Sequence, residues 1–559
     1  MQTFRLYYHT LKHLRPVQIY GRLWFHLYRP RPNMGPAPPR RPTAGVPLIP
    51  TCPRPPSLTG PNEFTFLNER AAVTKPEDWD SPSFSKLWLY NLHYFDDLNA
   101  EEADRRSSWH RDLLRRWMAE NPPGSGTGWE PYPTSLRIVN WIKWMLRGQD
   151  PVAGMLDSLA AQTKWLNKRL EYHLLGNHLL ANAKALVFAG LFFQGPEAER
   201  FYSKGMRILA RELREQILAD GGHFERSPMY HLIVLEDLLD LINLHHVYGK
   251  PCPEDWPETA GRMEDWSEVM RHPDGGIPLF NDAASGVAPG PKDLDEYAQR
   301  LAIRTAAESE RGVREGERSV RHLKDSGYVC IEEGSAVLLA DVGSVGPDYL
   351  PGHAHAGTLS FELSLGGQRV IVNSGVSEYA EGPERLRQRS TAAHSTVVLD
   401  GENSSEVWGG FRVARRAHVT DFTIRNTKDC CEIGATHNGY QHLPGKPLHR
   451  RRWQLTHNTL LVEDEIHTQG HHTVGSYLRL PPDLNVELAG PYRAQLSTGE
   501  QEAELAGIQW WPEGRVQVEE TSWHPMFNHS VPSLVCVFRM EASSASSAPL
   551  RFGFQIQWP

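Results

Sequence analysis

Two histidines separated by one alanine form the strongest chemical signal in the sequence. His353 and His355 lie in the segment Gly352-His-Ala-His-Ala-Gly357, directly before the strand-like segment Thr358–Leu365. Alternation along an extended chain places both imidazoles on the same side. Imidazole is a metal ligand and also an acid–base group near neutral pH, so this spacing predicts either a metal site or a catalytic pair.

A tyrosine in a dense polar segment is the second candidate. Residues 221–231 read Gly-Gly-His-Phe-Glu-Arg-Ser-Pro-Met-Tyr-His and lead into an apolar helix, with Glu225 and Arg226 ahead of Tyr230. Positive charge on Arg226 and His231 favours the phenolate form of a neighbouring tyrosine. Tyr230 is therefore predicted to exchange protons, although a tyrosine at a helix start more often packs with its hydroxyl bonded to a neighbour.

An asparagine and a histidine open another apolar helix directly after Gly176. Asn177 and His178 stand in Glu171-Tyr-His-Leu-Leu-Gly-Asn-His-Leu-Leu-Ala-Asn182. Asparagine is favoured at helix starts as an N-cap. Taken alone, the pattern favours a cap for Asn177 and leaves a binding role open.

An aromatic loop running into a helix supplies the remaining binding candidates. Arg137 and Asn140 are three residues apart and share one helix face, where an arginine fork could hold a substrate carboxylate or form a structural ion pair. Trp129, Tyr132 and Trp408 could stack on sugar rings or simply pack in the core.

The elements that must position these residues change in kind along the chain. Helical periodicity extends from about Ser107 to Glu310, which indicates a bundle or an α/α toroid of helix pairs. After about Gly327 the period becomes two, which predicts an antiparallel β-sandwich. The expected helices are Trp109–Met118, Ser135–Leu146, Met155–Tyr172, His178–Phe193, Glu197–Leu218, Met229–Tyr248, Trp266–Arg271 and Asp293–Ala307. The expected strands are Ala336–Ala340, Thr358–Leu365, Arg369–Val372, Ser395–Leu399, Arg451–Thr456, Thr459–Glu463, Arg515–Glu519 and Leu534–Phe538.

Length and composition fit an α+β multidomain protein with three parts. We expect a basic helix with a proline-rich connector over residues 1–62, the toroid over 63–320 and the β-sandwich over 321–559. The 59 basic and 67 acidic side chains give no sign of a nucleic-acid binder. The six scattered cysteines predict no disulfide framework. No apolar stretch is long and continuous enough for a transmembrane helix.

The first 60 residues carry nine Lys or Arg and no Asp or Glu. Residues 3–28 show apolar side chains at roughly helical spacing with basic residues between them. We expect this segment to dock on the acidic body of the chain, with an anionic membrane surface or a targeting role as alternatives. It lacks the continuous apolar region and the small-residue cleavage site of a secretory signal.

Taken together and in this order, these segments resemble those of the heparinase II/III-like polysaccharide lyases, over roughly residues 85 to 480. The resemblance implies that Asn177 neutralises a uronate carboxylate, that Tyr230 transfers protons and that His353 is its acid–base partner. It also implies a structural zinc ion at His355, position 373 and His394. The chain departs from the family pattern there, since Asn373 replaces the usual aspartate and Gly357 stands where the family often has another. The resemblance further implies a periplasmic or cell-envelope location, while the absence of a recognisable signal makes the cytoplasm the alternative.

The expected activity is β-elimination on an acidic, uronate-containing polysaccharide, with no nucleic-acid partner. Elimination needs donors aimed at the developing enolate, a base for the ring proton and an acid for the leaving oxygen. A glycoside hydrolase with Glu130 and Glu225 as paired carboxylates is one alternative. A non-catalytic glycan-binding or exopolysaccharide-assembly protein is another. The predicted substrate-binding set is Trp129, Tyr132, Arg137, Asn140, His178, Glu225 and Arg226.

Overall fold

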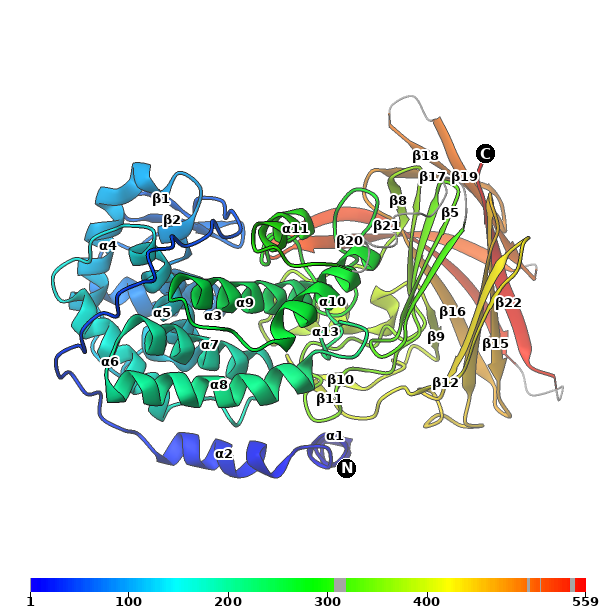
Figure 1. Ribbon diagram of the computed structural model, residues 1–559. Helices are drawn as coiled ribbons and strands as arrows, with labels where there is room; N and C mark the ends of the chain where they lie inside the picture. Colours follow the sequence, from blue (N-terminus) through cyan, green and yellow to red (C-terminus); the bar gives the residue numbers. More distant parts are fainter. Residues whose placement is uncertain (1, 306–317, 500–502, 513, 543–547) are drawn as a thin grey trace.

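The computed structural model describes residues 2–305, 318–499, 503–512, 514–542 and 548–559. Helices make up the first part of the chain and antiparallel sheets the second, and the two parts lie side by side (Figure 1). The helices of the first part are α1 (Gln2–Leu11), α2 (Pro16–Leu27), α3 (Lys86–Tyr94), α4 (Ser107–Glu120), α5 (Pro131–Leu146), α6 (Met155–Lys168), α7 (Gly176–Phe192), α8 (Pro196–Gln216), α9 (Pro228–Val247), α10 (Asp255–Val269) and α11 (Pro291–Arg300).

The toroid packs around two helices that are buried on nearly every side. α7 and α9 have long runs of Leu, Ala, Val and Ile, and α7 packs against α5, α8 and α9. A helix that is apolar all round must lie inside the protein, because no face of it is suited to water. The predicted helices are confirmed, except that α10 starts eleven residues earlier than expected and α11 ends at Arg300 rather than at Ala307. The end of the segment predicted over Asp293–Ala307 extends beyond the described residues.

A small sheet precedes the toroid and was not predicted. It contains β1 (Leu58–Gly60), β2 (Glu63–Phe66) and β3 (Glu69–Ala72), in that order. Strands of three or four residues show too little alternation to stand out in a sequence. The proline-rich connector before it runs without helix along the toroid, where the Arg41 backbone N–H bonds the Phe192 carbonyl.

The second part consists of antiparallel sheets around one apolar core. Their strand orders are β4-β5-β6-β7-β8, β20-β21-β16-β9 and β12-β13-β14-β15-β22-β19-β18-β17, with a separate pair β10-β11. The strands are β4 (Ser319–Leu323), β5 (Tyr328–Glu333), β6 (Ala336–Asp341), β7 (Phe361–Leu365), β8 (Gln368–Ile371), β9 (Val397–Leu399), β10 (Val407–Trp408), β11 (Arg412–Val413), β12 (Val419–Asn426), β13 (Cys431–His437), β14 (Leu448–Leu455), β15 (Thr459–His467), β16 (His472–Arg479), β17 (Leu484–Gly490), β18 (Arg493–Thr498), β19 (Ala503–Trp511), β20 (Arg515–Met526), β21 (His529–Ala542) and β22 (Leu550–Gln557). One further helix, α13 (Pro383–Arg389), lies between β8 and β9.

The β-hairpin predicted from a two-glycine turn is confirmed. β7 pairs with β8, and Gly366 and Gly367 between them have φ angles of 57° and 88°. Positive φ at both central residues is what the favoured two-residue hairpin turns require. All six cysteines are free thiols, as their scattered positions predicted.

The basic segment at the start of the chain forms α1 and α2, which lie against both parts of the molecule (Figure 1). Arg15 forms an ion pair with Glu215 of α8, and the Gln18 side-chain amide donates to the Tyr349 carbonyl at 2.9 Å. The expected docking on the body of the chain is therefore observed, through these polar contacts and through ring contacts of Tyr7 with Trp408 and Phe25 with His173. No helix among the described residues is long and apolar enough to cross a membrane.

Candidate functional site

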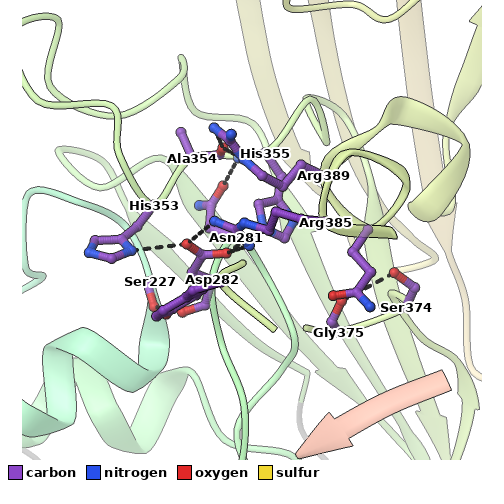
Figure 2. Close-up of polar contacts among 12 residues, drawn as sticks. Ser227, Asn281, Asp282, His353, Ala354, His355, Ser374, Gly375, Arg385 and Arg389 are labelled. Atoms are coloured by element: carbon purple, nitrogen blue, oxygen red, sulfur yellow. Dashed lines mark hydrogen bonds and ion pairs between the residues drawn. The ribbon is translucent and has the colours of Figure 1, made fainter. Parts of the chain in front are cut away.

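A buried aspartate in the loop between α10 and α11 organises the polar cluster where the two parts meet. Asp282 receives hydrogen bonds from His353 Nδ1 at 2.9 Å, His355 Nε2 at 2.8 Å and Arg385 Nη2 at 2.7 Å. Figure 2 shows the carboxylate between His353 and Arg385. Burial alone would raise its pKa, but Arg385 and the two imidazoles outweigh burial and hold the pKa of Asp282 well below its usual range.

The contact with Asp282 determines which nitrogen of His353 is available for chemistry. An ionised carboxylate only accepts hydrogen bonds, so His353 Nδ1 carries the proton in this contact. The other ring nitrogen, Nε2, makes no contact with Asp282, and it lies 3.6 Å from a Glu225 carboxyl oxygen. The same Asp282 fixes the position of the loop, because its backbone N–H donates to the His353 carbonyl at 3.0 Å.

Tyr230 lies flat against His353. Their ring centroids are 3.8 Å apart with an interplanar angle of 28°, and the Tyr230 hydroxyl is 3.2 Å from that of Tyr379. Tyr230 sits in the first turn of α9, whose start is capped by the Ser227 side chain. The predicted acid–base pair is thus brought together by a helix of the first part and a loop of the second.

The expectation that positive charge on Arg226 and His231 favours the phenolate form of Tyr230 is wrong. Burial, followed by the neighbouring Tyr379, raises the pKa of Tyr230 well above its usual value. The Arg226 guanidinium points instead to the second part of the chain, where it donates to the carbonyls of Ser344 and Asp325. Tyr230 is therefore a neutral phenol in the free protein and holds a proton that it can donate.

Asn177 is not the cap that the isolated pattern favoured. The N-cap position of α7 belongs to Leu175, and Asn177 is the second residue of the helix. Its side chain is only 8% exposed. No hydrogen bond to its side-chain amide is found within the described residues, so the amide is available to a ligand.

Glu225 connects Asn177 with His353. Burial raises the pKa of Glu225, while His353, His178 and the Asn177 backbone N–H act in the opposite direction. A side chain at Gly176 would disturb this corner, because a Cβ there would lie 2.5 Å from Leu350 Cδ2 and 3.0 Å from a Glu225 oxygen. Gly176 also has a φ angle of 55°, a conformation that favours glycine.

His178 and Tyr132 lie next to each other at the start of α7. Their ring centroids are 4.4 Å apart, and His178 Nδ1 is 3.2 Å from a Glu171 oxygen. Burial opposes protonation of His178, but Glu171 outweighs it and raises its pKa. His178 can therefore offer positive charge near Asn177, one residue away.

Three predicted binding residues lie in the toroid core instead. Arg137 is fully buried, donates to the carbonyls of His93 and Gly128, and lies 3.9 Å from the centroid of the Trp117 ring. The interpretation of Arg137 as a carboxylate fork, or as half of an ion pair, is therefore wrong. Asn140 donates to the Tyr94 carbonyl and to Asp96. Trp129 stacks on Trp117 and meets Trp165 edge to face.

The residues that the resemblance assigns to zinc do not fit that metal. His355 Nδ1 faces His394 Nε2 at 3.3 Å, while His394 Nδ1 bonds the Asn373 side-chain oxygen at 3.0 Å. The donor set is two imidazoles and a neutral amide, and the carboxylate within reach, Asp282, is already neutralised by Arg385. Among the described residues, no group of three or more His, Cys, Asp or Glu side chains is arranged to hold a metal ion.

Three important residues of the site were missed in the sequence. Asp282, Arg385 and Tyr379 lie in segments with no evident periodic pattern, and they reach the site through contacts between distant parts of the chain. In the sequence, the available signal for Asp282 was the Asn281-Asp282 pair that follows the apolar segment Pro278-Leu-Phe280. In the structure, Asn281 has a φ angle of 58° and turns the chain into the site.

Known proteins resemble this chain in both parts. The heparinase II/III N-terminus model matches residues 109–300, and the heparinase II/III-like C-terminal model matches residues 315–558. A heparin-sulfate lyase of Bacteroides stercoris is 28% identical over 247 residues, which cover 42% of this chain and 37% of that protein. FtsZ-localized protein C of Caulobacter vibrioides is 28% identical over 407 residues, covering 70% of this chain and 66% of that protein.

The matched regions thus span less than two thirds of the length of these relatives. Among solved structures, the crystal structure of heparinase III has the same fold, with a TM-score of 0.69 at 16% identity, covering 86% of this chain and 79% of that one. The two family models lie in chain order over the toroid and the β-sandwich described above. The chain belongs to the heparinase II/III family.

Proposed function

We propose that this protein is a polysaccharide lyase that cleaves a uronate-containing acidic glycan by β-elimination. The observation that carries this proposal is the Tyr230–His353 stack, in which a neutral phenol lies against an imidazole whose Nδ1 is held by Asp282. One group can donate a proton and the other can accept one, which is what elimination requires. The similarity to heparin-sulfate lyases supports the same activity.

The residues can be assigned to the steps of the reaction. The Asn177 amide, helped by the charge on His178, would bind the uronate carboxylate and stabilise the enolate that forms when C5 loses its proton. His353 Nε2 would take that proton. The electron pair forms the C4–C5 double bond, the C4–O bond breaks, and Tyr230 donates its hydroxyl proton to the departing oxygen.

The local contacts favour this assignment over paired-carboxylate hydrolysis. Glu130 bonds the Lys86 ammonium and the Tyr90 hydroxyl, while Glu225 faces His353. Neither contact places Glu130 and Glu225 on the two sides of one glycosidic bond, as hydrolysis by paired carboxylates requires. Glu225 fits better as a neighbour that tunes His353.

A non-catalytic role is the second candidate, and one observation favours it. The match to FtsZ-localized protein C is longer than the match to the Bacteroides stercoris lyase. In that role the same residues would bind a glycan without cleaving it.

Ultraviolet absorbance distinguishes the candidates, because elimination creates a conjugated double bond and hydrolysis does not. The purified chain would be incubated with a panel of acidic polysaccharides, beside Tyr230→Phe and the matched control Tyr440→Phe. Tyr440 is also buried, but its hydroxyl bonds the Val397 carbonyl inside the β-sandwich.

We expect absorbance to rise with at least one polymer. Tyr230→Phe should lower the rate by about 10²–10⁴, the usual contribution of an acid–base group, while Tyr440→Phe should leave it within about threefold. Reducing ends without absorbance would refute the lyase assignment. Binding without turnover, unchanged by Tyr230→Phe, would support the non-catalytic role.

A further inference from the structure

The outer face of α1 and α2 is an exposed apolar surface. Its large side chains repeat at helical spacing and are exposed, although Tyr7 also contacts Trp408: Phe4, Tyr7, Tyr8, Leu11, Ile19, Tyr20, Leu23, Trp24 and Leu27. Leu23 is 61% exposed and Trp24 is 62% exposed. An apolar stripe of this size on water is unfavourable unless something covers it.

The inner face of the same helices combines polar and apolar contacts. Thr10, Arg15 and Gln18 bond the body, and Gly21 approaches His173 closely. Val17 packs on the apolar core and the Phe25 ring lies 4.2 Å from that of His173. Most of the large apolar side chains are nevertheless exposed, whereas an ordinary surface helix turns its apolar side inward. The contacts with the body therefore leave the apolar stripe for another partner.

Positive charge surrounds the apolar face. Lys12, Arg22, Arg29 and Arg31 are exposed and make no ion pair within the described part of the chain. The neighbouring helix α8 adds a line of cations at positions 200, 204, 207, 211 and 214, which border two adjoining surface hollows, one of them also lined by Tyr172. The acidic groups of this helix are already engaged: Glu197 by Lys164, Glu199 by Arg41, Glu212 by Arg211 and Glu215 by Arg15.

We propose that the apolar face of α1 and α2, with the cationic line of α8 beside it, binds the surface of an anionic lipid membrane. Apolar and aromatic side chains enter the boundary between headgroups and acyl chains, while Lys and Arg contact the phosphates. Tyr and Trp are the residue types that membrane interfaces favour.

A second copy of the chain fits this face less well. The other large apolar side chains exposed among the described residues, Met34, Leu386, Phe411 and Leu488, lie on separate elements and offer no matching apolar surface. Pairing two copies of the α1–α2 face would oppose two sets of cations. A lipid surface supplies both the apolar layer and the negative charge.

Co-sedimentation of the full chain with vesicles tests the proposal, with phosphatidylglycerol-containing vesicles compared against pure phosphatidylcholine. The variants are Leu23→Ser/Trp24→Ser on the apolar face, Arg207→Gln/Arg214→Gln on α8, and the matched control Met34→Ser/Leu488→Ser elsewhere. Thermal melting checks that each variant is folded, and all six positions are exposed.

We expect binding to the anionic vesicles that weakens with salt, and a loss of about tenfold or more in the partition coefficient for Leu23→Ser/Trp24→Ser. The arginine variant should lose affinity mainly at low salt, and the control should match the wild type. Absence of binding to anionic vesicles, or equal binding by the Leu23/Trp24 variant, would overturn the proposal. Two further results would overturn it if vesicles do not bind. One is self-association that depends on this face, and the other is capture by an immobilised acidic polysaccharide that depends on this face. None of these readouts depends on lyase activity.

Discussion

Replacing Asp282 by asparagine tests the central ion pair without changing the shape of the site. The substitution keeps the size of the side chain but removes the charge that both guanidinium nitrogens of Arg385 contact. Arg385 and Asp282 are both fully buried, so the arginine would be left as an uncompensated internal charge. Breaking such a pair costs about 3–5 kcal/mol, a large part of an ordinary unfolding free energy.

The loss should be recovered when the partner charge is removed as well. Asp282→Asn/Arg385→Met contains neither charge, and a buried pair can often be replaced by apolar groups at little cost. We expect the double variant to regain at least about 2 kcal/mol relative to Asp282→Asn, which is the coupling expected of contacting residues. Urea denaturation followed by tryptophan fluorescence measures each free energy of unfolding.

The same substitution at Asp341, a half-buried aspartate at the end of β6, is the matched control. Burial raises the pKa of Asp341 to about 7, opposite to the shift at Asp282. Ionising Asp341 in the folded state is therefore unfavourable, and Asp341→Asn should be neutral or stabilising at pH 8. A fall of several kcal/mol in both variants would indicate a general intolerance of asparagine rather than a lost ion pair.

The pH dependence follows from the depressed pKa of Asp282. A carboxyl group whose pKa is lower in the folded state stabilises the fold above its unfolded pKa, and this stabilisation is lost as the pH falls towards the folded pKa. The difference between wild type and Asp282→Asn should be complete near neutral pH and should shrink below about pH 4. An Asp282→Asn variant within about 1 kcal/mol of wild type at pH 7, or a double variant no more stable than the single one, would refute this reasoning.

Three further predictions concern neighbouring groups. Asn177→Ala should leave the melting temperature within a few degrees, because the amide makes no internal bond among the described residues, yet lower the elimination rate by about 10²-fold or more; an unchanged rate would exclude it from carboxylate binding. Gly176→Ala should destabilise the chain by about 1–3 kcal/mol in the same urea assay, since its Cβ would overlap Leu350; a neutral effect would contradict the described packing. Wild-type protein purified with excess zinc and then dialysed should retain well below one zinc ion per chain, as measured by mass spectrometry, and Asn373→Asp should retain more. Stoichiometric zinc in the wild type would show that these residues do form a zinc site.

The elements could be predicted from the sequence because their patterns are local. The helix predicted from His178 to Phe193 appears as α7, whose two ends lie within a few residues of the predicted ones. The strand predicted from Thr459 appears as β15, which begins at that residue. The turn at Gly366 and Gly367 was equally local.

The candidate site was only partly predictable, because burial and charge depend on distant contacts. Tyr230 and His353 were found from their residue types and surroundings, and the structure brings them together. The predicted effect of Arg226 on the pKa of Tyr230 was wrong because Arg226, four residues away in sequence, bonds the β-sandwich instead. Arg137 looked like a surface fork, but its helix face lies in the core, which only the packing of other helices determines.

The bond between Asp282 and Arg385 also bears on how such a protein can evolve. The aspartate belongs to the toroid half and the arginine to the β-sandwich half, so each half alone would contain a charge with no partner. Recombination that exchanged one half for a distant relative's would succeed only where both members of the pair were kept. The pair thus makes the stability of each half depend on the other, although each has the outline of a separate module.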